Sequence, residues 1–136
     1  MFLFKRILPR IKPSARHQKM FLVIWKNIEY NIGNAFDEST GTFTCPHDEI
    51  YSFYATSSIY GQHDSSMKIY VNGSERVHHF LRNHGAGEQE FKHVSPNGVF
   101  KLSNGETVHI KMYGTYYKAS SECARTYFQG HLINLL

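Results

Sequence analysis

The feature that most limits the fold of this chain is an alternation of apolar and polar residues, broken at short intervals by turn residues, between residues 41 and 133. Successive side chains of a β-strand point to opposite faces, so a period of two predicts strands that bury one face. No stretch of ten or more residues keeps a helical period. The pattern therefore predicts an all-β protein.

Several predicted strands place an apolar residue at every second position. These positions are Phe43 and Cys45, then Tyr51, Phe53 and Ala55, then Met67, Ile69 and Val71, then Val108, Ile110 and Met112, and finally Phe128 and Leu132. Two Asn-Gly pairs, Asn72-Gly73 and Asn104-Gly105, predict hairpins because both residues tolerate a positive φ. Eight or more short antiparallel strands predict a sandwich or jelly roll, in which each sheet buries one face against the other.

The length and composition of the chain predict a single domain. Its 136 residues, 41% of them hydrophobic, are enough for one packed core. The longest uninterrupted apolar run, residues 20–25, is much shorter than the roughly 20 residues that a membrane-spanning helix needs. No transmembrane segment is expected.

The positive charge of the chain is concentrated near its N-terminus. Residues 1–26 contain seven Lys or Arg and no acidic residue, whereas residues 27–136 contain eight Lys or Arg and eleven Asp or Glu. The body of the protein is therefore mildly acidic, although the net charge is +4. A surface that binds nucleic acid would have to lie on the N-terminal segment alone, so no nucleic-acid partner is expected.

Residues 1–12 are expected to lie outside the fold, as a basic tail or a leader, with the globular domain at residues 13–136. The segment is rich in basic residues, contains a proline and shows no clear alternation. No signal peptide is evident, because Lys5-Arg6 interrupts the apolar run at residues 2–4.

The sequence contains no recognisable catalytic or metal-binding motif. Nine histidines are present, but no His-x-His pair would place two ligands on one face of a strand. Two cysteines, Cys45 and Cys123, are too few for a disulfide scaffold or a zinc site without histidine ligands. No Gly-x-Ser-x-Gly turn indicates a serine nucleophile. We expect no enzyme activity, no cofactor and no metal, with the histidines exposed on strands and loops.

Tyrosines and polar residues are concentrated in two predicted loops. One loop carries Tyr60, His63 and Asp64, and the other carries Tyr116 and Tyr117. Because an aromatic ring packs on the apolar face of a sugar while polar groups bond its hydroxyls, these are the candidate ligand-binding residues. Packing of the tyrosines on the edge of the sandwich is the alternative explanation.

Three ordered blocks of the sequence resemble a known family. The first block is Asn31-x-Gly33-x-x-Phe36-Asp37-x-x-Thr40-Gly41-x-Phe43-x-x-Pro46, followed by Ile50-Tyr51-x-Phe53. The second is Leu102-x-x-Gly105-Glu106-x-Val108, and the third is Phe128-x-Gly130-x-Leu132. Together they closely resemble the globular head domain family of complement component one, subcomponent q, and the match runs from about Ser14 to Ile133.

This resemblance implies a ten-stranded jelly roll of the tumour-necrosis-factor-like type that is usually trimeric, secreted and not an enzyme. Many invertebrate relatives are soluble pattern-recognition lectins. The expected function is therefore that of a single-domain, invertebrate-type member: a homotrimeric, lectin-like innate immune protein that binds microbial glycans or lipopolysaccharide. A cytokine-like or matrix protein that binds a protein receptor is the alternative. In an extracellular protein, Asn72-Gly73-Ser74 makes Asn72 a glycosylation candidate.

The resemblance also implies where a trimer would form. On one sheet, the residues of outward parity make an apolar and aromatic set on a face that a monomer would leave in water. The expected interface residues are Tyr54, Val99, Tyr127, Gln129 and His131.

Three differences from the family pattern carry further expectations. Pro13 stands where the first strand normally has an aromatic residue, so that strand is expected to be short or at an edge. The loop that holds calcium in some relatives offers only Glu88 and Glu90 here, so ligand binding is expected to be independent of calcium. The strand order of the family places Cys45 and Cys123 near opposite ends of the sandwich, so no disulfide between them is expected.

Overall fold

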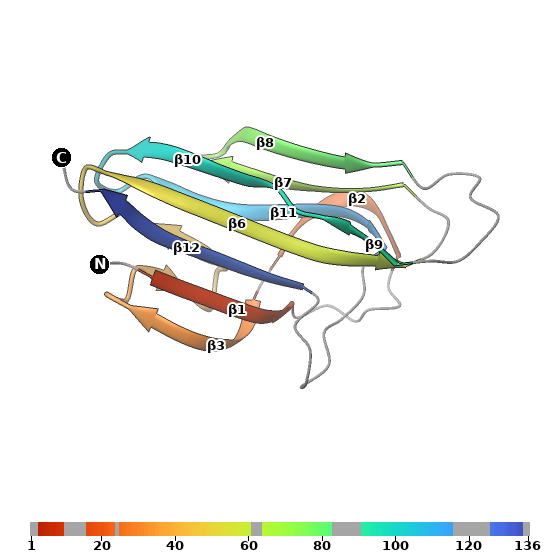
Figure 1. The fold of residues 1–136 in the computed structure, drawn as a ribbon, viewed down its shortest axis with the longest axis horizontal. Coiled ribbons are helices and arrows are strands. Elements are labelled where there is room, and N and C mark those ends of the chain that lie inside the picture. The colour runs from red at the N-terminus through yellow and green to blue at the C-terminus, as the bar shows by residue number, and fades with distance from the viewer. Residues whose placement is uncertain are drawn as a thin grey trace.

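The computed structural model describes residues 3–9, 16–23, 25–60, 64–82, 91–115 and 126–134. Within these ranges the chain forms strands joined by turns, with no helix. The strands are β1 (Leu3–Pro9), β2 (Arg16–Leu22), β3 (Trp25–Ile32), β4 (Phe36–Asp37), β5 (Thr42–Thr44), β6 (Glu49–Tyr60), β7 (Ser65–Val71), β8 (Ser74–Leu81), β9 (Phe91–Val94), β10 (Asn97–Leu102), β11 (Thr107–Thr115) and β12 (Thr126–Asn134). They form two antiparallel sheets packed face to face (Figure 1). The expected all-β jelly-roll sandwich is confirmed.

Each sheet has five strand positions. The first sheet has the order β10-β6-β12-β1-β3, with β9 also paired to β6; the second has the order β4-β5-β11-β7-β8, with β2 also paired to β11. β9 and β10 keep one register along β6, with Val94 opposite Ser57 and Asn97 opposite Tyr54, so they are two parts of one strand. β2 and β5 likewise share one edge of β11. The resulting ten positions are those of the expected jelly roll.

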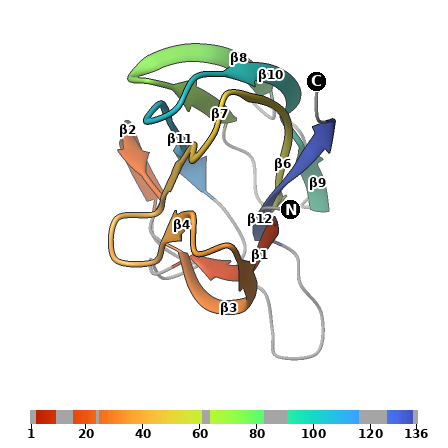
Figure 2. The ribbon, with the colours of Figure 1, turned by 90° about the vertical axis from the view of Figure 1, so that its left-hand side faces the viewer.

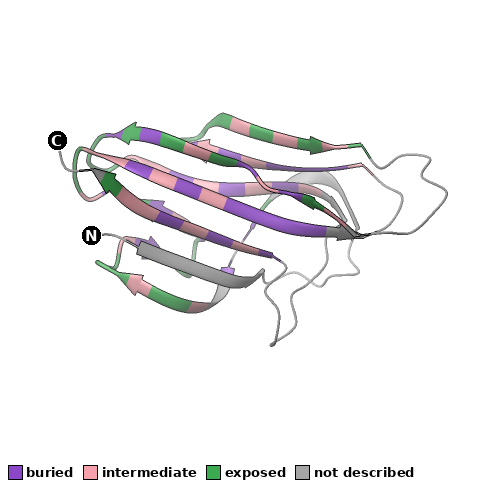
Figure 3. Ribbon diagram, viewed as in Figure 1, coloured by how far each residue is buried: buried purple, intermediate pink, exposed green. Residues whose placement is uncertain are grey.

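The core lies between the two sheets and is rich in aromatic rings. Its largest fully buried side chains are Trp25, Phe43, Tyr51, Phe53, Met67, Ile69, Leu102 and Phe128. The ring centroid of Phe43 lies 5.2 Å from that of Phe53 and 5.4 Å from that of Tyr51, in edge-to-face orientations. Figure 3 shows buried and less buried residues alternating along β6 and β12. The sequence alternation therefore marks the side chains that face the opposite sheet, each contributing about 1.5–3 kcal/mol by burial.

The two Asn-Gly turns connect their strands in different ways. Asn72 and Gly73 have φ values of 51° and 81° and close a hairpin between β7 and β8, as predicted. The predicted hairpin at Asn104-Gly105 is wrong, because β10 belongs to the first sheet and β11 to the second. This turn is held by the segment before β6 instead: Gly105 N donates to the Cys45 carbonyl at 2.8 Å, and Asn104 N donates to Asp48 Oδ1 at 2.7 Å. The Asn-Gly residues therefore reverse the chain direction, but they do not determine which sheet the following strand joins.

The expectation that residues 1–12 lie outside the fold needs correction. Leu3–Pro9 form β1, which pairs with β12 on one side and β3 on the other (Figure 2). A strand between two neighbours satisfies its backbone donors and acceptors on both edges, and a basic composition does not prevent this. Pro9, which cannot donate a hydrogen bond, is the last residue of the strand. Pro13, which was expected to leave the first strand short or at an edge, is outside the described residues.

Candidate functional site

The predicted ligand-binding residues lie at or beyond the described part of the chain. Tyr60 is the last residue of β6, with its backbone opposite Phe91, and Asp64 immediately precedes β7 and is half-buried. The side chain of Tyr60 and the whole of His63, Tyr116 and Tyr117 are outside the described residues, as are Glu88 and Glu90 of the expected calcium-poor loop. A ligand site made by these tyrosines therefore stays a prediction.

The strand ends that lead into the two predicted ligand loops lie at the same end of the sandwich. β6 ends where the first loop begins, and β7 starts where that loop ends. Tyr113, near the end of β11, lies opposite Ser66, near the start of β7. The end of β6, the start of β7 and the end of β11 therefore lie together at the right-hand end of the sandwich in Figure 1.

At this end of the sandwich, the buried residues change from aromatic to hydroxyl-bearing side chains. Six buried hydroxyl residues are gathered here: Thr56, Ser57, Ser58, Ser65, Ser66 and Thr126. The Ser57 and Thr126 hydroxyls lie 3.0 Å apart, and those of Thr56 and Ser95 lie 2.7 Å apart. These pairs satisfy groups that would be costly to bury alone. The run at 56–58, which breaks the apolar alternation of β6, is the sequence signal that could have revealed this cluster.

The five predicted interface residues share the outer face of the first sheet. They lie on the neighbouring strands β6, β10 and β12, at positions that alternate with core residues. The rings of Tyr54 and Tyr127 are 5.8 Å apart, and Val99 is 60% exposed. Burial raises the pKa of Tyr127, and the nearby Tyr54 hydroxyl raises it further. On β3, Ile32 is a further exposed apolar residue of this sheet, at 51%.

The outer face of the second sheet carries a set of basic and aromatic residues that the sequence analysis did not single out. Lys68 on β7 lies directly opposite Lys111 on β11, and on its other side directly opposite His78 on β8. In the next row, Tyr70 lies opposite His109. The sequence showed that His109 and Lys111 alternate with apolar residues in β11. It contained no local signal that they lie beside Tyr70 and Lys68 of β7.

The groups of this second face contact one another closely. Lys68 Nζ lies 2.8 Å from Glu75 Oε1, and His78 Nδ1 lies 3.6 Å from the same oxygen. The hydrogen bond from Lys68 lowers the pKa of Glu75. The rings of Tyr70 and His109 stack at 5.3 Å with an angle of 11° between their planes.

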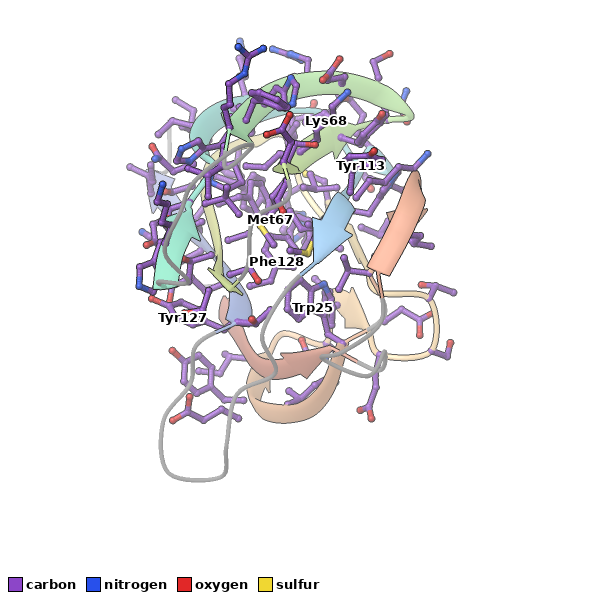
Figure 4. The ribbon with its side chains drawn as sticks, turned by 90° about the vertical axis from the view of Figure 1, so that its right-hand side faces the viewer. Trp25, Met67, Lys68, Tyr113, Tyr127 and Phe128 are labelled. Atoms are coloured by element: carbon purple, nitrogen blue, oxygen red, sulfur yellow. The ribbon has the colours of Figure 1, made fainter. Side chains whose placement is uncertain are left out.

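Lys111 completes this arrangement. Its Nζ lies 4.6 Å from the ring centroid of Tyr70. Burial, and then the charge of Lys111, lower the pKa of His109. In Figure 4, Lys68 and Tyr113 lie on one side of the molecule and Tyr127 on the other, with Met67 and Phe128 between them.

The remaining chemistry of the described residues is structural. Cys45 is fully buried, its Sγ donates to the His47 carbonyl at 2.8 Å, and burial raises the pKa of its thiol. Cys123, its possible partner, is outside the described residues. Across the described ranges, no group of three or more His, Cys, Asp and Glu is arranged to hold a metal ion. In the same ranges there is no helix of the length and apolarity needed to cross a membrane.

These features define the chain as a jelly-roll sandwich domain of the tumour-necrosis-factor-like type. Solved structures with this fold include the globular domain of zebrafish complement 1qA protein, with 18% identity, a TM-score of 0.74, and coverage of 98% of both chains. Murine APRIL at pH 8.0 is also similar, with 12% identity, a TM-score of 0.71, and coverage of 97% of this chain and 98% of that one. The C1q domain family matches residues 8–133, and the chain belongs to that family. The family is non-enzymatic, and its members typically trimerise and are generally secreted.

Proposed function

We propose that this protein is a secreted, trimeric, lectin-like protein of innate immunity that binds microbial glycans or lipopolysaccharide, as single-domain invertebrate-type members of the family do. Membership of a recognition family supports the general role. The observation that carries the trimer is the outer face of the first sheet, where Tyr54, Tyr127 and Val99 lie together.

This face is suited to burial against copies of the same chain. Val99 and Ile32 expose 60% and 51% of their surface, and the paired rings of Tyr54 and Tyr127 lie between β10 and the β1–β3 side of the sheet. Leaving such a set in water costs free energy that a symmetric oligomer recovers. Gln129 and His131, half-buried on β12, supply polar groups for hydrogen bonds at the same interface.

The proposed ligand residues are Tyr60, His63, Asp64, Tyr116 and Tyr117. The strand ends that carry them share one end of the sandwich, which supports a common site. A trimer would present three such sites on one side, and simultaneous binding to a repeating surface would raise the overall affinity. Asn72, exposed in the β7–β8 turn, is the proposed glycosylation site.

Two measurements on the purified protein test this function. Light scattering should give the mass of three chains, and a stable monomer at tens of micromolar would contradict the trimer. An array of microbial glycans and lipopolysaccharides, read with and without a chelator, should show binding that is independent of calcium. Binding abolished by the chelator would contradict the calcium expectation. Binding to a protein receptor, with no glycan bound at any concentration tested, would favour the cytokine-like or matrix alternative.

Replacement of Tyr60 and Asp64 by Ala tests the loop site. Loss of a stacked ring and a hydroxyl bond should weaken binding by about 1–3 kcal/mol. Tyr30→Ala, which removes an exposed tyrosine from the edge strand β3, is a control for loss of a ring. Its mass is measured alongside, because Tyr30 shares the outer face of the first sheet with Gln129. Equal affinity in the double variant and the wild type would move the site away from this loop.

A further inference from the structure

The outer face of the second sheet places like charges directly opposite each other. Lys68 and Lys111 are cross-strand partners on β7 and β11, and His78 is the partner of Lys68 on β8. Directly opposed like charges in a sheet destabilise it. These three residues form a basic row that spans three adjacent strands, about 10 Å at the usual spacing of about 4.8 Å between strands.

The positive charge of this row is only partly neutralised. Glu75 is the only carboxylate on β7, β8 and β11, and it bonds Lys68 at one end of the row. Within the described residues, no carboxylate pairs with Lys111, whose Nζ lies against the ring of Tyr70. The row therefore keeps an excess of positive charge on its Lys111 side.

Aromatic and hydroxyl groups flank the basic row on both sides. Tyr70 and His109 form the row beside it, and on the opposite side Tyr113 lies across from the buried Ser66. His109 and Lys111 already pack against the ring of Tyr70, so this ring positions two basic groups and is not a free stacking platform for a nucleobase. The face thus offers ammonium, imidazole and phenolic hydroxyl groups, half-buried apart from the exposed His78.

We propose that the basic row of Lys68, Lys111 and His78 binds an acidic polysaccharide, a glycan chain that carries carboxylate or sulfate groups. Its anionic groups complement the opposed lysines and relieve the repulsion between them, and its hydroxyls bond to the flanking tyrosine and histidine. This inference rests on the proposed glycan-recognition function. It names the chemical class of one ligand and places its site on the outer face of the second sheet, separate from the loop residues.

The test uses the full chain with alginate and dextran sulfate as acidic probes and neutral dextran as the uncharged control. Lys111→Gln should weaken binding of both acidic probes about three- to tenfold, the effect of losing one charged contact. Glu75→Gln, which frees Lys68 from its carboxylate, should strengthen binding about two- to threefold. Lys101→Gln, an equal loss of charge on β10 of the first sheet, is the matched control and should leave binding unchanged.

A stability measurement separates a binding role from a structural one. Because Lys111→Gln removes one of two opposed charges, its melting temperature should be equal to or higher than that of the wild type. A lower melting temperature with unchanged binding would show that Lys111 serves the fold and would overturn the proposal. Binding weakened at least as much by Lys101→Gln as by Lys111→Gln would also overturn it, since the effect would then be one of net charge.

The outcomes also distinguish this proposal from the broader function. Acidic glycans that bind the wild type and both second-sheet variants equally would overturn the basic row as the site and leave glycan recognition standing. Binding of neutral glycans and not of acidic ones would likewise overturn the basic row as the site and leave glycan recognition standing. Failure to bind any glycan would overturn both. Binding to vesicles of anionic lipid but not to acidic polysaccharide would assign the row to a membrane surface and overturn the polysaccharide.

Discussion

The outer faces of the two sheets are built on the same kind of backbone and carry different side chains. The first face presents Tyr54, Tyr127 and the exposed Val99, whereas the second presents the opposed pair Lys68 and Lys111. In both sheets most inward residues are apolar and buried, apart from the hydroxyl residues at one end of the sandwich. The packing of a sandwich therefore constrains the inward-facing residues of each strand, whereas the outward-facing residues are free to suit contacts with other molecules. The first face is suited to copies of the same chain, and the second to a charged, hydrated partner.

The largest expected effect comes from removing β1, a central strand of the first sheet. Deletion of residues 1–9 should lower the free energy of unfolding by at least about 3 kcal/mol, because β12 and β3 both lose their neighbour and their backbone groups lose partners. Urea denaturation measures this. The double variant Lys5→Gln and Arg6→Gln is the control, since it removes charge and keeps the strand. A deletion as stable as the control would show that the segment is dispensable, as its composition suggested.

The next effect concerns the assembly proposed for the first face. Val99→Asp places a charge on the apolar set and should raise the dissociation constant of the trimer at least about tenfold. The monomer should keep its fold, because Val99 is 60% exposed. Sedimentation over a concentration series measures the shift. Lys111→Gln, on the second face, should leave the mass unchanged, and equal dissociation in both variants would remove the distinction between the faces.

A smaller effect is expected where the edges of the two sheets meet. A Cβ at Gly98 on β10 would lie 2.6 Å from Phe100 Cζ and 3.2 Å from Cγ2 of Val77, which belongs to β8 of the other sheet. Gly98→Ala should therefore destabilise the fold by about 1–3 kcal/mol through overpacking. Thermal denaturation compares it with Val99→Ala, a neighbouring change that creates no close contact. Equal stability of the two variants would mean that Phe100 moves away without cost.

The smallest effect is a pH dependence confined to the second face. The pKa of His109 is lowered in the folded state, first by burial and then by Lys111. An unfolded histidine binds its proton near pH 6.5, so as the pH falls below about 6.5 the unfolded chain gains protons before the folded one and stability is lost. His109→Gln should remove this contribution. Urea unfolding at pH 7 and pH 5 should show a smaller loss for the variant, and equal losses would contradict the assignment.

Much of the fold could be predicted from local sequence because strand alternation and turn chemistry are local properties. Tyr51, Phe53 and Phe128 are buried as the alternation required, and Asn72-Gly73 closes its hairpin with both residues at positive φ. The same reasoning gave the wrong partner for Asn104-Gly105, whose strands belong to different sheets. An Asn-Gly pair has the same conformational freedom in both places, yet Asn72 adopts a positive φ and Asn104 does not. The second turn bonds to Cys45 and Asp48, which lie far from it in the sequence.

The candidate sites divide in the same way. The residues of the first face could be named from outward parity, and the structure gathers them on three adjacent strands, although their role in a trimer stays a prediction. The basic row could not be named, because Lys68 and Lys111 are 43 positions apart in the sequence and meet only through the register of β7 and β11.

By itself, the sequence determined that this chain forms short antiparallel strands, which side of each strand is buried, and which family it belongs to. Those properties follow from the period of two, from the φ preferences of glycine and asparagine, and from blocks of core residues at set separations. Only the tertiary structure decided that Leu3–Pro9 is a central strand, that the chain crosses between sheets after β10, and that Lys68 lies opposite Lys111. Each of these depends on hydrogen bonding between segments far apart in the chain, which no local pattern specifies.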